Sequence, residues 1–164
     1  MSREFHALGS SKWLGLATFV AVCLGIAAFG GAVTGNSVGT WYQTLRKPQF
    51  TPPDWLFAPV WTLLYIAIAV AGWRVWMARR RARTRIALTA YSVQLALNLA
   101  WSFVFFAYHM IGAAFAEILM LLAAISVNAV LFWRIDRTAG WLLAPYAAWV
   151  AFASVLNFTL WRLN

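Results

Sequence analysis

The chain has 164 residues, of which 63% are hydrophobic and only 10% are charged, and its formal net charge is +9. A soluble domain carries about 25% charged residues, so the composition excludes an ordinary soluble protein and indicates an integral membrane protein. The basic residues flank apolar stretches and form no stripe on a soluble face, which argues against nucleic acid as a partner.

Five apolar stretches are each long enough for a helix of about 20 residues to cross the roughly 30 Å hydrocarbon core of a bilayer. Helices are required because lipid offers no hydrogen-bond partners to open strand edges. The sequence therefore predicts an all-α membrane protein, a five-transmembrane-helix bundle that forms one domain over residues 1–164. The expected helices cover about residues 13–33, 55–77, 86–107, 111–133 and 139–161.

The first of these stretches is too long for the apolar core of a secretory signal, so we expect a retained helix. Short side chains let membrane helices approach closely. Ala17, Ala21 and Gly25 recur every four residues on the first helix, as do Ala96 and Ala100 on the third. This spacing predicts the faces through which the two helices contact their neighbours.

The connection from about residue 34 to 54 is the longest, and it leads into a second helix that is equally rich in rings. Prolines fix backbone angles and remove hydrogen-bond donors, while aromatic rings offer flat, weakly polar surfaces. We therefore predict a stiff loop that covers a flat apolar ligand. The rings and prolines of this region are Trp41, Tyr42, Pro48, Phe50, Pro52, Pro53, Trp55, Phe57, Pro59, Trp61 and Tyr65.

Acidic, histidine and cysteine residues are too few and too widely spaced for a catalytic pair or a metal site. Cys23 is the only cysteine, and His6 and His109 are the only histidines, so we expect no disulfide, no metal and no required cofactor. Glu117 is the one acid expected within the membrane, either in a structural role or as a proton carrier. Asp54 is expected to be the N-cap of the second helix.

Polar and aromatic side chains on three expected helices predict one pocket. Amides within apolar spans must meet each other, the backbone, water or a ligand, so interhelical hydrogen bonds that only hold the bundle remain the alternative. The residues are Trp61 and Tyr65 on the second helix, Gln94, Asn98 and Trp101 on the third, and Trp149, Ala153 and Asn157 on the fifth.

Tryptophans at expected helix ends have a simpler explanation, because indoles favour the membrane interface. We expect interfacial anchoring for Trp13, Trp55, Trp133, Trp141 and Trp161, and a cytoplasmic belt for Trp73 and Trp76.

The basic residues are distributed unevenly between the two ends of a five-helix bundle. Ten fall on one side and three on the other, so the positive-inside rule predicts a cytoplasmic N-terminus and an external C-terminus in an inner membrane. Attraction to anionic lipid explains the run from Arg79 to Arg85. The ten are Arg3, Lys12, Arg74, Arg79, Arg80, Arg81, Arg83, Arg85, Arg134 and Arg137, and the three are Arg46, Lys47 and Arg162.

Four separated motifs, in order, resemble the TspO/MBR family of tryptophan-rich sensory proteins, which includes the mitochondrial translocator protein, or peripheral-type benzodiazepine receptor. The resemblance runs nearly end to end. The motifs are Trp41-Tyr42 with Lys47-Pro48; Pro52-Pro53-x-Trp55-x-Phe57-x-Pro59-Val60-Trp61-Thr62-x-x-Tyr65; Gln94-x-x-x-Asn98-x-x-Trp101-Ser102; and Pro145-Tyr146-x-x-Trp149-x-x-Phe152-Ala153 with Leu156-Asn157.

The resemblance implies a homodimer in a bacterial cell envelope, with a pocket under the first loop that takes porphyrins and benzodiazepine-type ligands. The expected ligand is protoporphyrin IX or a haem-type tetrapyrrole, and membrane lipid is the other expected partner. The residues carried over from the family and those of the pocket inferred above together form the predicted ligand-binding set. This set is Trp41, Tyr42, Pro48, Trp61, Tyr65, Gln94, Asn98, Trp101, Trp149, Ala153 and Asn157.

The sequence differs at one motif from the animal members of the family, which bind cholesterol through Leu, Tyr and Arg on the fifth helix. Here Leu156 and Arg162 flank Phe158 at the position of the tyrosine. The missing hydroxyl argues against high-affinity sterol recognition.

Three functions follow from this comparison. The first is a membrane sensor that binds porphyrins and regulates tetrapyrrole handling or a stress response. The second is an enzyme for light-dependent porphyrin breakdown, with Trp41 and Trp149 as its catalytic residues. The third is a transporter of tetrapyrrole, lipid or sterol, which the lack of an internal repeat disfavours.

Overall fold

The computed structural model describes the backbone of residues 2–78 and 81–164 and the side chains of residues 12–78 and 83–164. Within these ranges, five segments are long and apolar enough to cross a membrane: Lys12–Val38, Asp54–Met77, Arg83–Ala107, Ile111–Trp133 and Arg137–Leu163. The predicted all-α architecture is confirmed. Its elements are α1 (Ser2–Val38), α2 (Trp41–Thr44), α3 (Asp54–Met77), α4 (Arg81–Ser102), the π-helix η1 (Phe103–Ala107), α5 (Ile111–Trp133), α6 (Arg137–Leu142) and α7 (Ala144–Leu163).

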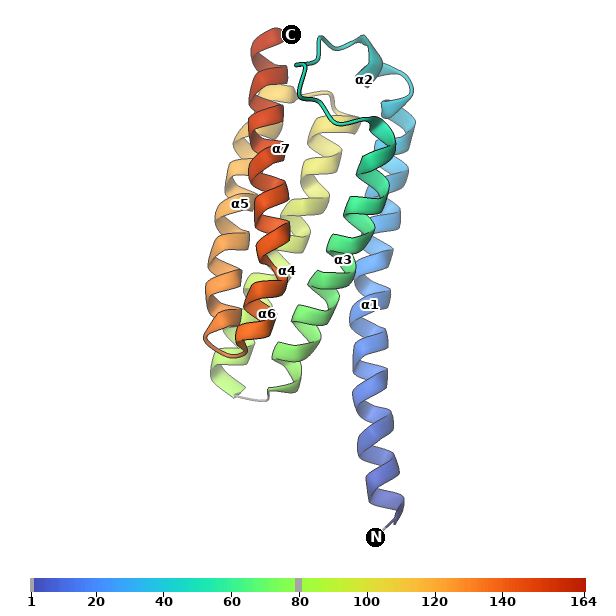
Figure 1. The fold of residues 1–164 in the computed structure, drawn as a ribbon, viewed down its shortest axis with the longest axis vertical. Helices are drawn as coiled ribbons and strands as arrows, with labels where there is room; N and C mark the ends of the chain where they lie inside the picture. Colours follow the sequence, from blue (N-terminus) through green and yellow to red (C-terminus); the bar gives the residue numbers. More distant parts are fainter. Residues whose placement is uncertain (1, 79–80) are drawn as a thin grey trace.

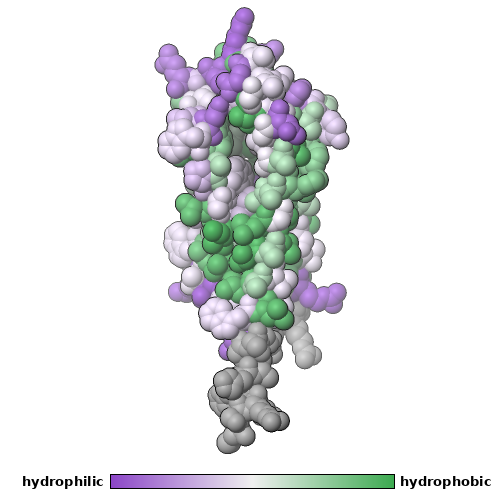
Figure 2. All heavy atoms as spheres, turned by 90° about the vertical axis from the view of Figure 1, so that its right-hand side faces the viewer, coloured by the Kyte–Doolittle hydropathy of each residue, from purple (hydrophilic) through white to green (hydrophobic). Residues whose placement is uncertain are grey.

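The long helices lie side by side in one bundle whose two termini are at opposite ends (Figure 1). α1 packs mainly on α3, α4 on α5, and α5 on α7. The short α2 and the loop around it cover the end at which α7 finishes. Hydrophilic residues gather at the ends and hydrophobic residues between them (Figure 2), as expected of a chain that spans a bilayer.

The helix boundaries differ from the sequence-based ones at three places. α1 continues to Val38, so the connection to α3 is shorter than expected and contains α2. The third span changes to π-helical geometry at Phe103. The fifth span is divided between α6 and α7 at Leu143, because Pro145 lacks an N–H and its ring would crowd the carbonyl group of Trp141 in a continuous helix.

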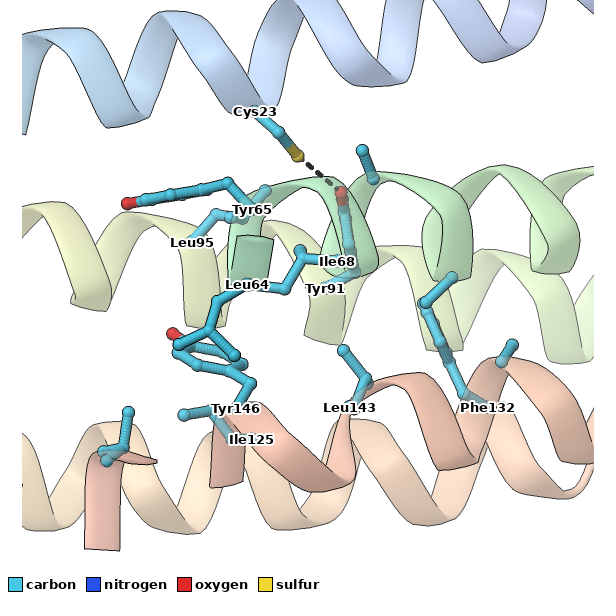
Figure 3. Packing of buried hydrophobic residues seen from close by; sticks show 14 of the residues in the cluster. Cys23, Leu64, Tyr65, Ile68, Tyr91, Leu95, Ile125, Phe132, Leu143 and Tyr146 are labelled. Atoms are coloured by element: carbon cyan, nitrogen blue, oxygen red, sulfur yellow. Dashed lines mark hydrogen bonds between the residues drawn. The ribbon is translucent and has the colours of Figure 1, made fainter. Parts of the chain in front are cut away.

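The predicted contact face of α1 is not used within this chain. Ala17, Ala21 and Gly25 are exposed, as is Ala96 on α4. α1 instead turns Cys23 inward, where its sulfur lies 3.0 Å from the hydroxyl group of Tyr91 (Figure 3).

The close approach of α1 and α3 depends on glycines that face aromatic rings. A Cβ on Gly72 of α3 would lie 2.8 Å from Phe19 and 2.9 Å from Tyr91, and one on Gly15 of α1 would lie 2.6 Å from Trp76. Trp76 is therefore part of this helix contact as well as of the expected belt. In an alanine-rich chain, regular spacing of small residues arises by chance. The α1–α3 contact is instead determined by the aromatic rings that pack against Gly15 and Gly72.

The start of α3 also corrects a prediction. Pro53, with φ −57° and ψ 141°, is the N-cap, and Asp54 is the first helical residue. The Asp54 carboxylate accepts a hydrogen bond from Gln43 Nε2 at 2.7 Å. A carboxylate in the first turn is favoured by the helix dipole, and here it also ties α2 to α3.

At the opposite end of the bundle, Asp136 links α3 to α6. Its carboxylate accepts hydrogen bonds from Arg74 at 3.0 Å and from the Ala139 N–H at 3.1 Å, so it pairs with α3 and caps α6. Burial would raise the pKa of Asp136, but these hydrogen bonds and the Arg74 charge outweigh it and lower the pKa.

The expected grouping of basic residues is observed for the described side chains. Lys12, Arg74, Arg83, Arg85, Arg134 and Arg137 lie toward the end of the bundle opposite α2, whereas Arg46, Lys47 and Arg162 lie toward the α2 end. The side chains of Arg3, Arg79, Arg80 and Arg81, as well as those of Glu4 and His6, lie outside the described residues. The side of the membrane on which each end lies stays a prediction.

Candidate functional site

The candidate site is an aromatic layer beneath α2. Tyr42 is buried, and its ring packs 6.4 Å from that of Phe105 and 6.0 Å from that of Phe106. Trp41 stacks on His109 with a centroid distance of 4.0 Å and meets Phe105 edge-on at 5.6 Å. The two loop residues thus contact η1 and the turn after it.

The π-helix η1 brings its rings under the loop. Its backbone hydrogen bonds run from residue i to i+5 instead of i+4, and its Phe105 ring stacks on Trp101 at 5.1 Å. Ser37 at the end of α1 donates a 2.6 Å hydrogen bond to the Phe106 carbonyl group. His109, with φ 56°, then turns the chain into α5.

The loop is held in place by polar contacts at several points. Lys47 donates to Gln43 Oε1 at 3.0 Å, and its ammonium lies 4.5 Å from the Tyr42 ring centroid. The Asn164 amide accepts from the Arg46 N–H at 2.9 Å and donates to the Arg46 carbonyl group at 3.1 Å. The Pro48 carbonyl group accepts from the backbone and side chain of Thr51.

The Asn164 contacts tie the loop to the end of α7, and its stiffness stays a prediction. Burial raises the pKa of Tyr42 to about 12, and the negative charge of Asp54 adds to the effect. The Tyr42 hydroxyl group is therefore neutral at physiological pH.

A polar network lies deeper in the bundle. The Tyr65 hydroxyl group on α3 donates to Asn98 Oδ1 on α4, and Asn98 Nδ2 donates to the Tyr146 hydroxyl group on α7 at 3.0 Å. Trp61 packs against both tyrosines, at 5.8 and 6.2 Å. Figure 3 shows Tyr65 and Tyr146 entering the core from opposite helices.

Two buried polar side chains beside this network have no hydrogen-bond partner among the described residues. Gln94, one turn before Asn98, is 0% exposed, and neither its oxygen nor its nitrogen is bonded. Glu117 on α5 is 8% exposed, and both of its oxygens are unbonded. Unpaired buried polar groups are costly, so Gln94 and Glu117 are candidates for a role beyond packing.

The remaining amide of the predicted set has a structural role. Asn157 Oδ1 accepts from the Trp101 indole N–H at 3.1 Å, and Asn157 Nδ2 donates to the Ile111 carbonyl group at 2.9 Å. Asn157 therefore joins α4, α5 and α7, as the interhelical alternative supposed.

Trp149 and Ala153 lie on α7, where Trp149 meets Phe57 of α3 edge-on at 6.0 Å and contacts Phe152 at 5.7 Å. Trp41 and Trp149 do not stack on each other; the ring nearest to Trp41 is that of His109, and the ring nearest to Trp149 is that of Phe152. Figure 2 shows the surface hollowed just below the hydrophilic α2 end, on the face that carries α1 and α3.

The structure thus gathers the predicted ligand-binding residues toward the α2 half of the bundle, in two connected groups. Trp101 packs against both buried clusters and joins the layer under the loop to the deeper core. Sequence reasoning missed Phe105, His109 and the hydrogen-bonding role of Tyr146. Only Tyr146 carried a signal, since it follows Pro145 in a quoted motif.

Comparisons with known proteins agree with the motifs. The model of the TspO/MBR family matches residues 19–162. The tryptophan-rich protein TspO of Chlorobaculum tepidum is 37% identical over 158 residues, covering 92% of this chain and 96% of the relative. The CrtK protein of Rhodobacter capsulatus is 34% identical over 152 residues (92% and 95%), and the human translocator protein is 36% identical over 126 residues (76% and 75%).

Proposed function

The chain belongs to the TspO/MBR family, and on that premise we propose that it is a membrane-embedded binding protein for a porphyrin or a related flat hydrophobic ligand. In this proposal ligand occupancy regulates tetrapyrrole handling or a stress response. Relatives are named a tryptophan-rich sensory protein, in Cereibacter sphaeroides, and a translocator protein, in Homo sapiens. The proposal includes a homodimer in a bacterial cell envelope.

Gln94 is the observation that carries this proposal. A fully buried amide with both polar atoms unbonded is costly in a bundle that only needs to pack. It lies one turn from Asn98, whose neighbours Tyr65, Tyr146 and Trp61 provide hydroxyl groups and a ring face. A macrocycle with ring N–H groups and an aromatic plane complements such a surface.

The loop supplies the complementary charge. Arg46 is exposed and Lys47 half-buried, and neither forms an ion pair within the described residues. Both lie at the covered end, where the propionates of a porphyrin would emerge. Charge-assisted hydrogen bonds from these side chains would orient the ligand.

Quenching of tryptophan fluorescence by protoporphyrin, in the dark and in detergent, tests binding. We expect saturable quenching, weakened about tenfold in Trp149→Ala by the loss of one stacked ring, and weakened also in Gln94→Leu. Trp141→Ala is the matched control, because Trp141 is 64% exposed at the opposite end. Absence of quenching would exclude the tetrapyrrole function, and unchanged affinity in Trp149→Ala would exclude this site.

Illumination of the saturated complex separates binding from turnover. A stable porphyrin absorbance band supports a sensor or a carrier. Protein-dependent loss of the band in light and oxygen, abolished in a Trp41→Phe, Trp149→Phe variant, would identify the degrading enzyme instead. Flux of porphyrin into proteoliposomes would identify a transporter.

A further inference from the structure

A groove opens between the start of α4 and the end of α5, at the end of the bundle away from α2 and from the proposed ligand site. It has a volume of about 350 Å³ and is lined by Arg83, Ile86, Leu131, Arg134 and Ile135. This volume falls within the roughly 300–1,000 Å³ range of small-molecule sites. The lining of the groove thus combines two arginines with three apolar side chains.

A second groove, of about 300 Å³, continues from the first along α5. Ser126, Val127 and Val130 line it together with Leu131 and Arg134, which belong to both grooves. From Arg134 to Ser126 the helix rises by about 12 Å. The two grooves therefore form one path that is basic at one end and apolar along its length.

The basic end lies at the expected level of lipid headgroups. Arg83 begins one membrane-spanning segment, and Arg134 directly follows the end of another. Trp133 and Trp141, paired edge-on at 5.1 Å and partly exposed, lie at the same level, as interfacial indoles do. Val127 and Val130, 57% and 51% exposed, then face the hydrocarbon.

The charge of the groove is not balanced within the described side chains. Their only ion pair joins Arg74 to Asp136, whose carboxylate also caps α6. Glu117 is 17 residues from Arg134 on the same helix, or about 25 Å. Arg83 and Arg134 therefore present unneutralised positive charge to an anion.

We propose that this groove binds an anionic phospholipid, with its phosphate between Arg83 and Arg134 and one acyl chain along Val130 and Val127. A lipid fits better than a free anion, because the apolar path begins at the arginines and leads into the bilayer. A diffuse basic surface would attract anionic lipids generally, whereas this site retains one molecule. The inference does not depend on the proposed porphyrin function.

Native mass spectrometry of the full chain in detergent tests the site, with dioleoyl phosphatidylglycerol and dioleoyl phosphatidylcholine as probes. We expect one phosphatidylglycerol to be retained in preference to phosphatidylcholine. Arg83→Gln, Arg134→Gln should weaken that binding about fivefold for each arginine removed. The matched control is Arg85→Gln, Arg137→Gln, which removes the same charge from exposed residues at the same end that line neither groove.

A charge-neutral variant tests the apolar path independently. Val130→Trp fills it at an exposed position and should displace phosphatidylglycerol without loss of helicity in circular dichroism. Equal losses in the two arginine variants, equal retention of the two lipids, or unchanged binding in Val130→Trp would each overturn the proposal. Displacement of the lipid by millimolar inorganic phosphate would also overturn it, because that result marks a free-anion site. Loss of the dimer in Val130→Trp with lipid still bound would overturn it as well and would assign the groove to a second copy of the chain.

Discussion

A single amide, that of Asn98, connects three helices in the interior of the bundle. Its oxygen accepts from Tyr65 and its nitrogen donates to Tyr146, which is 0% exposed. Tyr146→Phe removes the acceptor and leaves a buried N–H group unpaired. Because interhelical hydrogen bonds in membranes contribute about 0.6 kcal/mol on average and at most about 2, we expect a loss of about 1 kcal/mol in thermal unfolding in detergent.

Tyr108→Phe is the matched control for that change, because Tyr108 is 67% exposed and lies outside the Asn98 network. Its unfolding midpoint should equal that of the unmodified chain. An equal loss in both variants would show that the measurement reports surface chemistry and not the Asn98 network.

Sequence reasoning located polar residues better than it located their partners. Gln94, Asn98 and Asn157 could be predicted to lie inside, because amides in apolar spans must be bonded or functional. Both polar atoms of Asn157 are bonded, to Trp101 and Ile111, whereas those of Gln94 have no partner among the described residues. This difference depends on the rotation and register of the helices. The stack of Trp41 on His109 likewise depends on the turn that His109 makes after η1.

At the scale of elements, the contact between α1 and α3 makes a sharp prediction. Gly72→Ala should destabilise the bundle by about 1–3 kcal/mol, the usual cost of overpacking, because the new methyl group would lie within 3 Å of Phe19 and Tyr91. Gly25→Ala on α1 meets no atom within 4 Å and should be neutral, or stabilising by up to about 1 kcal/mol. Thermal unfolding of the two variants compares them, and a reversed order would contradict the α1–α3 packing described above.

The α5–α6 connection predicts a dependence of stability on pH. The pKa of Asp136 is lower in the folded chain than its ordinary value of 3.8, so the unfolded state takes up the proton first and acid favours unfolding. This contribution is complete above pH 3.8 and is lost as the pH falls toward the lower, folded-state pKa. We expect the midpoint temperature of thermal unfolding of the unmodified chain to decrease over that pH range.

Asp136→Asn isolates that contribution, because asparagine can still cap α6 but carries no charge to pair with Arg74. The variant should be less stable at neutral pH, and the difference should shrink as the pH is lowered below about 3.8. A constant difference would mean that the Arg74 pair contributes nothing measurable.

The sequence was sufficient to predict the membrane-spanning helices. It predicted where the helices begin and end only in part. Five apolar stretches predict five membrane-spanning helices, because a helix satisfies its backbone hydrogen bonds within one segment. The break before α7 could have been predicted from Pro145. The π-helix η1 could not, because it is stabilised by distant contacts, such as the hydrogen bond from Ser37 to the Phe106 carbonyl group.

For the whole molecule, five crossings separate two chemically different ends. One end is covered by the aromatic loop, which Asn164 ties to α7. The other carries six described basic side chains, the Arg74–Asp136 pair and the groove lined by Arg83 and Arg134. The two proposed sites therefore face opposite sides of the membrane, and a tetrapyrrole and an anionic lipid could be bound at the same time.

The orientation of these ends can be tested because Cys23 is the only cysteine and is fully buried, so a membrane-impermeant maleimide should leave the unmodified chain unlabelled. Gln49→Cys lies in the exposed loop and Thr138→Cys at the start of α6, both at exposed positions. Because the positive end is expected to stay in the cytoplasm, we expect Gln49→Cys to be labelled in intact inner-membrane spheroplasts and Thr138→Cys only after permeabilisation. The reverse pattern would place the arginine-rich end outside, and labelling of both positions in intact spheroplasts would mean a mixed orientation that the charge difference between the ends does not control.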